Sequence, residues 1–398
     1  MALKKFGRVS KAAVLALSVI MLCMPLTACK DDEAESNTSS VVEAIPVDEL
    51  MNPSVQQAPA PAAETQVETA AEPVEEVPVA AEIPAGMYVS ELTGEPISEA
   101  IRDQRPVAIM VDNEKLALPH YGTAEADVVY EIMNSTANDR ITRLMLIYKD
   151  WGNIERLGSI RSTRPTNILL ASEWNAVLCH DGGPYYNKQY FDYRDWAEHF
   201  SGTFSRIANG KASEFTEYVV RGDLQKNFDS SGYSTTYNQY EPAGASESHF
   251  NFTPYGTVVD LSKKYDTLYT ARYVSLPFKH NKSQLAFNSA TGKYEYYEYD
   301  IHHLDEEDGE PLAFENVILQ GCDFVQLDAN GYLIYDVIST GPAMYIHNGI
   351  AVDCAWAKNS ETDITRFYDV NGDELMINTG KTYIGLIPLD SWSSVRLE

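Results

Sequence analysis

The sequence predicts an α+β protein with a mixed α/β first domain over residues 85–232 and a smaller, mainly antiparallel β second domain over residues 233–398. Two observations carry this prediction. In the first domain, short apolar runs that end in turn residues alternate with helix-like runs. In the second domain, tyrosine becomes frequent, the apolar runs become shorter, and turn signals such as Asn-Gly recur between them.

The chain begins with a predicted export signal over residues 1–28. Four bases lie within the first 11 residues, an apolar run follows over residues 12–24, and Leu26-Thr27-Ala28-Cys29 has the lipobox pattern of bacterial lipoproteins. We therefore expect Cys29 to carry lipid and to anchor the protein at the outer face of the cytoplasmic membrane. A plain secretory signal or a short membrane anchor is the alternative, although the apolar run is shorter than the roughly 20 residues that a spanning helix needs.

Residues 29–84 are predicted to form a disordered, acidic tether rich in Pro, Ala and Glu. The segment has no aromatic residue and holds 13 acidic residues against one base, Lys30. Such a composition buries too little apolar surface to offset its conformational entropy. Treated as a flexible coil, the tether reaches on the order of 40 Å from the membrane.

The net charge argues against two classes of partner. The chain carries a formal net charge of −28. The predicted signal contributes four positive charges and the predicted tether has an excess of negative ones, which leaves a net charge of about −20 on the residues beyond 84. A body this acidic disfavours nucleic acid and anionic lipid headgroups as partners. A local group of arginines is correspondingly more informative than it would be in a basic protein.

The apolar runs predict the elements of both domains. In the first domain, we expect strands over residues 106–113, 127–133, 141–148 and 176–180, a helix that begins at Pro165, and a second helix over residues 213–228. In the second domain, we expect strands over residues 256–261, 283–288, 293–300, 315–320, 331–339, 349–356, 374–380 and 382–389.

Three cysteines remain in the body, namely Cys179, Cys322 and Cys354. An odd number leaves at least one free thiol, and we favour a disulfide between Cys322 and Cys354 because both lie in the strand-rich part. The sequence has no CxxC motif, no HExxH motif and no Gly-rich phosphate loop.

The stretch over residues 157–183 carries the candidate ligand site. Two arginines flank a Ser-Thr pair ahead of Pro165, where their guanidinium groups and the free N–H groups of a helix start can converge on one anion. A His-Asp-Gly-Gly run follows the next strand, and the carboxyl ends of strands border ligand crevices in open α/β sheets. The candidate residues are Arg161, Ser162, Arg164, His180, Asp181 and Gly183, with Asn113, Glu131 and Arg143 as neighbours at strand ends.

Alternatives remain open for this stretch. The two arginines can instead pair with internal acids such as Glu131 or Asp127 and only fix the loop. Cys179 and His180 are adjacent in a strand and point to opposite faces, so they cannot form a catalytic dyad directly. Ser162 with His180 and Asp181 would suit a hydrolase.

Metal binding has a weaker basis in the sequence. A histidine and acid cluster occurs where the chain runs His302, His303, Asp305, Glu306, Glu307 and Asp308. Adjacent histidines in a strand diverge, however, and the acids are typical of a solvated turn. We therefore predict no metal ligands, no cofactor and no catalytic residues.

The body resembles the YerB-like lipoproteins of bacteria. The resemblance lies in RPVAIMVDN, ADVVYEIM, ITRLMLIY, GSIRSTRP and AVLCHDGG of the first part, and in ENVILQ, GPAMYIHNG and the run from Ala355 to Pro388 of the second. It implies a membrane-anchored extracytoplasmic protein with an α/β first domain and a smaller second domain, and it implies no reaction.

Taken together, the sequence predicts a non-enzymatic binding or scaffold protein of the cell envelope. Its expected partners are the lipid anchor and a cell-wall fragment or an envelope protein. The alternative is a hydrolase or other enzyme that acts on cell-wall polymer.

Overall fold

The computed structural model describes residues 80–398, so the predicted signal, Cys29 and nearly all of the predicted tether lie outside the described residues. No helix within the described range is both long and apolar enough to cross a membrane.

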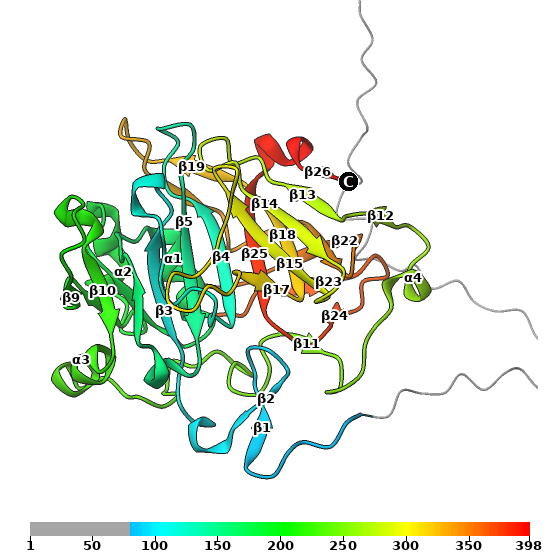
Figure 1. The fold of residues 1–398 in the computed structure, drawn as a ribbon, viewed down its shortest axis with the longest axis horizontal. Coiled ribbons are helices and arrows are strands. Elements are labelled where there is room, and N and C mark those ends of the chain that lie inside the picture. The colour runs from blue at the N-terminus through cyan, green and yellow to red at the C-terminus, as the bar shows by residue number, and fades with distance from the viewer. Residues whose placement is uncertain (1–79) are drawn as a thin grey trace, which may run out of the picture. The chain divides into compact units, whose positions relative to one another are not determined.

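A mixed sheet of 11 strands forms the centre of the body (Figure 1). Its order is β12 (Tyr269–Thr270), β22 (Ile350–Ala357), β21 (Thr340–His347), β18 (Asn316–Cys322), β25 (Thr382–Pro388), β4 (Val128–Met133), β5 (Thr142–Tyr148), β3 (Val107–Asp112), β7 (Val177–His180) and β8 (His199–Ser201), and β23 (Arg366–Tyr368) pairs with β22. Within it, β25 pairs in parallel with both β18 and β4. Strands from the two ends of the described chain therefore share one sheet.

The central strands are apolar because the sheet is covered on both faces. Every residue of β3, β4 and β5 is buried. Successive side chains of a strand point to opposite faces, and along β3 Ala108 and Met110 enter one apolar cluster while Ile109 and Val111 enter the other.

Different elements cover the two faces of the central sheet. On one face, α1 (Pro165–Ser172) packs with the hairpin of β19 (Phe324–Gln326) and β20 (Leu333–Tyr335). On the other face lie α3 (Asp223–Ser231) and a second sheet of six strands, which overlies β18 and β25 in Figure 1. These strands are β13 (Tyr273–Ser275), β14 (Gln284–Asn288), β15 (Lys293–Glu298), β16 (Ile301–His302), β17 (Ala313–Phe314) and β26 (Arg396–Leu397).

Short elements complete the body. Smaller sheets are formed by β1 (Met87–Val89) with β2 (Pro96–Ser98), by β6 (Arg156–Gly158), β10 (Glu217–Val220) and β9 (Ser205–Arg206), and by β11 (Asn251–Phe252) with β24 (Met376–Ile377). The remaining α-helices are α2 (Lys188–Phe191) and α4 (Leu261–Lys264). Short 3₁₀ helices cover Glu99–Ile101, Lys115–Ala117, Trp151–Asn153, Tyr185–Asn187, Ser213–Phe215 and Leu389–Ser394.

The predicted fold class is confirmed, with a mixed first part and a mainly antiparallel second part. Two predicted elements are wrong. Residues 213–228 form a 3₁₀ turn, strand β10 and the start of α3, because the β-branched Val219 and Val220 pair with β6 and Gly222 (φ 87°) separates the strand from the helix. Residues 256–261 form a turn and the start of α4, where Asp260 caps the helix.

The predicted disulfide is also wrong. Cys179, Cys322 and Cys354 are all free thiols. Strand β21 lies between the strands of Cys322 and Cys354, since Ala343 pairs with Gln320 on one side and with Cys354 on the other. A separation of two strands is about 10 Å, beyond the roughly 7 Å between Cα atoms that a disulfide spans.

Candidate functional site

Several polar residues meet at one edge of the central sheet. Strand β3 ends at Asp112, Asn134 follows the end of β4, and β5 begins at Thr142 beside Arg143. Because β3 and β4 are each antiparallel to β5, the carboxyl ends of the first two and the amino end of the third lie at the same edge. The segment that follows β6 pairs with β3, where the N–H of Arg161 donates to the carbonyl of Met110 at 3.0 Å.

This edge holds a pocket of about 520 Å³ that contains three arginine side chains. Its walls include aromatic and apolar side chains, amides and carboxylates. The lining residues are Asp112, Glu114, Leu116, Asn134, Ser135, Ala137, Asn138, Ile141, Arg143, Arg161, Arg164, Glu214, Phe215, Asn330 and Tyr332.

Arg161 is the most solvent-exposed of the three arginines, and two carboxylates already compensate its positive charge. Its side chain is 24% exposed, its Nε lies 2.8 Å from Oδ2 of Asp112, and its Nη1 lies 3.2 Å from Oε2 of Glu214. The alternative partners named from the sequence, Glu131 and Asp127, form no ion pair with it among the described residues.

Arg143 is held mainly by neutral groups. Its Nη1 donates to Oδ1 of Asn134 at 3.2 Å and to the carbonyl of Ser162 at 2.9 Å, and Asp112 lies 3.9 Å from its Nε. That Nε makes no hydrogen bond within residues 80–398. Burial lowers the pKa of Arg143 to about 10, which Asp112 opposes and Arg161 reinforces.

Arg164 is buried without a carboxylate partner. Its Nε donates to the carbonyl of Asn134 at 3.1 Å, its Nη1 donates to the carbonyl of Thr163 at 2.9 Å, and its guanidinium lies 4.6 Å from the centre of the Tyr332 ring. No acid of the described chain forms an ion pair with it. Burial and then the charges of Arg143 and Arg161 lower the pKa of Arg164 to about 9.

Arginine remains protonated at neutral pH even after such a shift. The lowered pKa values therefore express the unfavourable energy of burying neighbouring positive charges, which an anion in the pocket would relieve. The arrangement is chemically suited to bind a carboxylate or a phosphate.

The His-Asp-Gly-Gly run lies beside the arginine segment, but its side chains do not line the pocket. The N–H of Asp181 donates to the carbonyl of Arg161 at 3.0 Å, and the N–H of Thr163 donates to the carbonyl of Gly182 at 3.2 Å. Gly183 (φ 156°) packs against Asn187, where a Cβ atom would collide with its amide. The run therefore supports the backbone that carries the arginines.

The side chains of this run have partners elsewhere. His180 contacts the carbonyl of Gly182 at 2.8 Å and Nδ1 of His199 at 3.0 Å, and Asp181 pairs with Arg206 at 2.8 Å. The Ser162 hydroxyl contacts Arg143 at 3.2 Å and has no hydrogen bond to His180. Within the described residues, the Ser162 hydroxyl therefore has Arg143 as its hydrogen-bond partner and not His180.

Asn113 and Glu131 do not line this pocket. They lie at the interface between the central sheet and the second sheet. Oε1 of Glu131 accepts hydrogen bonds from Thr142 at 2.7 Å and Ser283 at 2.6 Å, and its Oε2 accepts from Tyr383 at 2.6 Å. Asn113 donates to Thr142 at 2.9 Å. Burial raises the pKa of Glu131 to about 7, and the hydrogen bonds from the three hydroxyl groups oppose that shift.

The histidine and acid cluster of residues 302–308 is divided in the structure. His302 stacks on Tyr297 with ring centres 4.5 Å apart, and Asp305 accepts the N–H groups of Gly122 and Ala124 at 3.0 Å each. His303 instead lies with His120 and Glu298, a group whose atoms have the types and spacing of metal ligands. Sequence reasoning missed this group because no local pattern links residue 120 to residues 298 and 303.

The chain is similar to two models of one family, whose description is "Protein of unknown function (DUF3048)". The N-terminal domain model matches residues 92–234 and the C-terminal domain model matches residues 274–384. The chain is 25% identical over 312 residues to the "Putative lipoprotein YerB" of Bacillus subtilis strain 168, a match that covers 75% of this chain and 85% of that protein.

The fold is also similar to that of a solved structure, the crystal structure of the YerB protein from Bacillus subtilis. The two share a TM-score of 0.63 at 20% sequence identity, over 78% of this chain and 99% of the other. At this identity the likeness extends to the fold alone.

Proposed function

The chain belongs to the YerB-like two-part family, and from this membership we propose that it is an extracytoplasmic lipoprotein that binds an anionic ligand of the cell envelope without transforming it. In this proposal Cys29, which lies outside the described residues, carries the lipid. The pocket around Arg143, Arg161 and Arg164 receives the ligand.

The observation that carries the proposal is Arg164, a buried guanidinium with no carboxylate partner in the described chain. A charge removed from water is strongly unfavourable unless another charge or hydrogen bonds compensate for it. Arg164 also lies at the amino end of α1, whose dipole is positive there and favours an anion.

The balance of charge in the pocket favours a ligand with one negative group. Three carboxylates, those of Asp112, Glu114 and Glu214, line the pocket with the three arginines. Arg161 is already paired with two of them and Arg143 lies 3.9 Å from one of these, Asp112, so Arg164 has no carboxylate partner and Arg143 only a distant one. A planar carboxylate fits such donors in bidentate fashion, whereas the acids would repel a polyphosphate.

The size and walls of the pocket suit a fragment larger than the anion itself. A volume of about 520 Å³ accommodates a small organic molecule. The rings of Phe215 and Tyr332 provide apolar surface beside the guanidinium groups. We therefore propose a peptide carboxylate of a cell-wall fragment as the ligand.

Calorimetric titration of the full chain carrying Cys29→Ser tests this proposal. The probes are a cell-wall stem peptide with a free C-terminal carboxylate, the same peptide with an amidated C-terminus, and inorganic phosphate. We expect the free acid to bind most tightly. Arg164→Met should weaken that binding about tenfold or more, because a hydrogen bond to a charged group contributes about 1.5–3 kcal/mol.

The matched control is Arg194→Ala, which removes an exposed arginine that pairs with Glu361 outside the pocket and should leave the affinity unchanged. Equal binding of the acid and the amide, or an unaltered affinity in a folded Arg164→Met protein, would contradict the proposal. Preferred binding of phosphate would keep the pocket as an anion site but replace the proposed ligand.

A further inference from the structure

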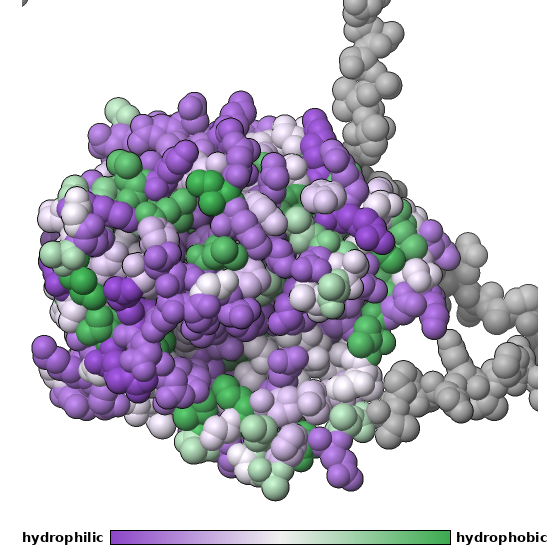
Figure 2. All heavy atoms as spheres, in the orientation of Figure 1, coloured by the Kyte–Doolittle hydropathy of each residue, from purple (hydrophilic) through white to green (hydrophobic). Residues whose placement is uncertain are grey.

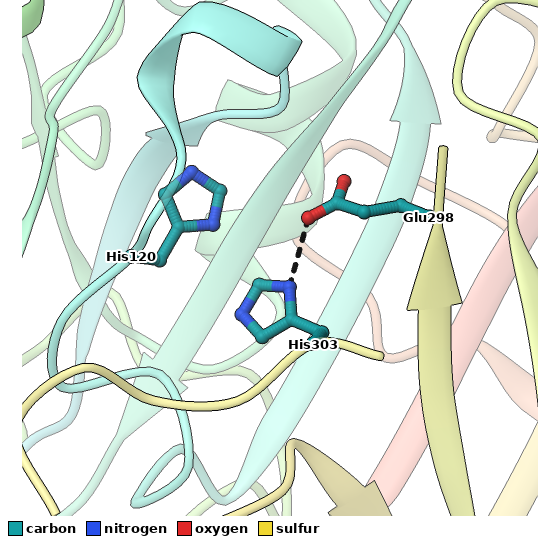
Figure 3. A group of neighbouring side chains, drawn as sticks. All are labelled: His120, Glu298 and His303. Atoms are coloured by element: carbon teal, nitrogen blue, oxygen red, sulfur yellow. Dashed lines mark hydrogen bonds and ion pairs between the residues drawn. The ribbon is translucent and has the colours of Figure 1, made fainter. Parts of the chain in front are cut away.

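A second group of buried polar side chains lies between the central sheet and the second sheet. His120 comes from the loop ahead of β4, Glu298 is the last residue of β15, and His303 follows β16. Figure 3 shows the three side chains pointing toward one another from these separate segments. Their ligand-type atoms all lie within 4.8 Å of one another.

The group is sealed from solvent and incompletely hydrogen-bonded. The exposed fractions are 0% for His120, 1% for Glu298 and 4% for His303. Neither ring nitrogen of His120 and only one carboxylate oxygen of Glu298 has a hydrogen-bond partner within residues 80–398. Buried polar atoms are nearly always partnered, so three unpartnered atoms at one point favour a bound species there, such as a metal ion or a water molecule.

The hydrogen bonds around His303 fix the orientation of its ring. Nε2 lies 3.1 Å from the Thr123 hydroxyl, whose O–H can donate in turn to Oδ2 of Asp305 at 3.4 Å. When this hydroxyl donates to Asp305 it accepts from His303, and in that arrangement Nε2 of His303 carries the proton and Nδ1 presents a lone pair. Such outer partners orient the histidine ligands of metal sites.

The lone pair of Nδ1 then faces another acceptor. Nδ1 of His303 lies 2.9 Å from Oε1 of Glu298, so in this arrangement either a proton on the carboxyl group or a cation must lie between the two atoms. Two acceptors at this distance repel each other unless a cation or a proton lies with them. A metal ion bound to both atoms, and to a nitrogen of His120, removes the repulsion and provides the missing partners.

We propose that His120, Glu298 and His303 bind one divalent first-row metal ion, with Zn²⁺ as the best fit. Two imidazole nitrogens and one carboxylate oxygen form a recognised protein ligand set for zinc, which leaves a fourth position for water. The three ligand atoms, which lie within 4.8 Å of one another, would have to draw closer to reach the roughly 2.0–2.2 Å bonds that zinc prefers. The neighbouring carboxylates of Asp112 and Asp305 add negative charge that favours a cation.

The proposed metal joins the two parts of the family fold. His120 lies in the segment matched by the N-terminal family model, whereas Glu298 and His303 lie in the segment matched by the C-terminal model. Metal binding to the folded state alone stabilises that state, so metal removal should lower the melting temperature. None of the three proposed metal ligands lines the arginine pocket, so the two proposals can be tested separately.

The first test measures zinc and cobalt binding by the full chain carrying Cys29→Ser after treatment with a chelator. We expect one Zn²⁺ per chain in competition with a chromophoric chelator, and the visible absorption of four-coordinate Co²⁺ on substitution. Absence of stoichiometric binding in this protein would overturn the proposal. A thiolate-to-cobalt charge-transfer band would also overturn it, because it would assign the metal to cysteine.

Variants locate the metal within the chain. Glu298→Gln preserves the side-chain volume and His120→Ala removes one nitrogen donor, and each should abolish stoichiometric binding and the rise in melting temperature on zinc addition. His302→Ala is the matched control, because His302 lies next to His303 but stacks on Tyr297 and should leave binding intact. Stoichiometric zinc binding that survives in Glu298→Gln would overturn the assignment.

Discussion

Arg164 and Glu173 are buried charges at the two ends of α1, and the fold compensates only one of them. Oε1 of Glu173 lies 3.0 Å from Nζ of Lys358 and accepts from the Thr365 hydroxyl at 2.8 Å. His249 lies 3.4 Å from its other oxygen. We therefore interpret Glu173 as part of a structural ion pair, whereas Arg164 is the group that carries the proposed anion site.

Removal of Lys358 tests the structural ion pair. Lys358→Met leaves Glu173 buried without its counter-charge and should lower the free energy of unfolding by about 3–5 kcal/mol. Urea denaturation at neutral pH measures this change. Lys282→Met is the control, since Lys282 and Asp300 are exposed and their pair should contribute under about 1 kcal/mol. Similar losses in both variants would contradict the interpretation.

The same carboxylate predicts a dependence of stability on pH. Burial alone raises the pKa of Glu173, but Lys358 and His249 outweigh burial and lower the pKa to about 2. A lowered pKa gives stability that is present above the unfolded value near 4.5 and is lost as the pH falls toward 2.

Glu173→Gln separates the contribution of Glu173 to the pH dependence of stability from the contributions of the other carboxylates. The variant should be less stable than the parent protein at pH 7, and the difference should narrow as the pH falls below about 4.5. Denaturant titrations at a series of pH values provide the comparison. A difference that stays constant down to the lowest pH at which both proteins fold would argue against the assigned shift.

Among the elements, β18 and β21 approach closely at a pair of glycines. A Cβ atom on Gly341 would lie 2.6 Å from Nε1 of Trp356 and 2.7 Å from the carbonyl of Gly321. These two groups form a hydrogen bond of 2.9 Å in the buried layer. The absence of a side chain at position 341 therefore allows the two strands and the indole to pack together.

Gly341→Ala should force these groups apart and lower the free energy of unfolding by about 1–3 kcal/mol, the range for overpacking a core. Denaturation followed by tryptophan fluorescence measures the loss. Gly152→Ala is the control, because no atom lies within 4 Å of its added Cβ and the change should be under about 0.5 kcal/mol. An unaltered stability in Gly341→Ala would mean that the strands accommodate the methyl group.

Elements with strong local patterns could be predicted from the sequence. Strands β3, β4 and β5 are continuous apolar runs bounded by turn residues, and Pro165 marks the first turn of α1. The helix predicted over residues 213–228 was wrong because the polar residues on both sides of Val219 and Val220 produce a pattern that is also typical of a helix. The pairing of β10 with β6, which decides the outcome, is a tertiary contact.

Candidate sites were predictable only where their residues lie close in the sequence. Arg161 and Arg164 could be grouped because a helix start follows them, and the ends of β3 and β5 bring Arg143 to the same pocket. The group of His120, Glu298 and His303 depends on contacts between distant segments. Its residues carry no local signal that distinguishes them from other buried histidines and acids.

For the whole molecule, the surface suggests how it attaches to the cell. Figure 2 shows a face on which hydrophilic side chains predominate and apolar ones are scattered in small groups. The body is also acidic, so anionic lipid headgroups repel it. On this basis we expect attachment to depend on the lipid at Cys29.

Cys29→Ser should therefore move the protein from the membrane fraction to the soluble fraction. Cell fractionation followed by immunoblotting measures the distribution, and Cys23→Ser, in the predicted signal, is the control that should leave it unchanged. Retention of the Cys29→Ser protein on membranes would contradict anchoring through this residue.

The position of β25 between β18 and β4 has a consequence for export. If the chain crosses the membrane from its amino end, β4 emerges long before the strand that covers its edge, because Thr382 pairs with Val128. Until then, an apolar strand exposes unpaired N–H and C=O groups, which can template aggregation. The central sheet lacks β25 until nearly the entire chain has emerged. A nascent chain stalled before residue 382 should therefore require a chaperone to remain soluble.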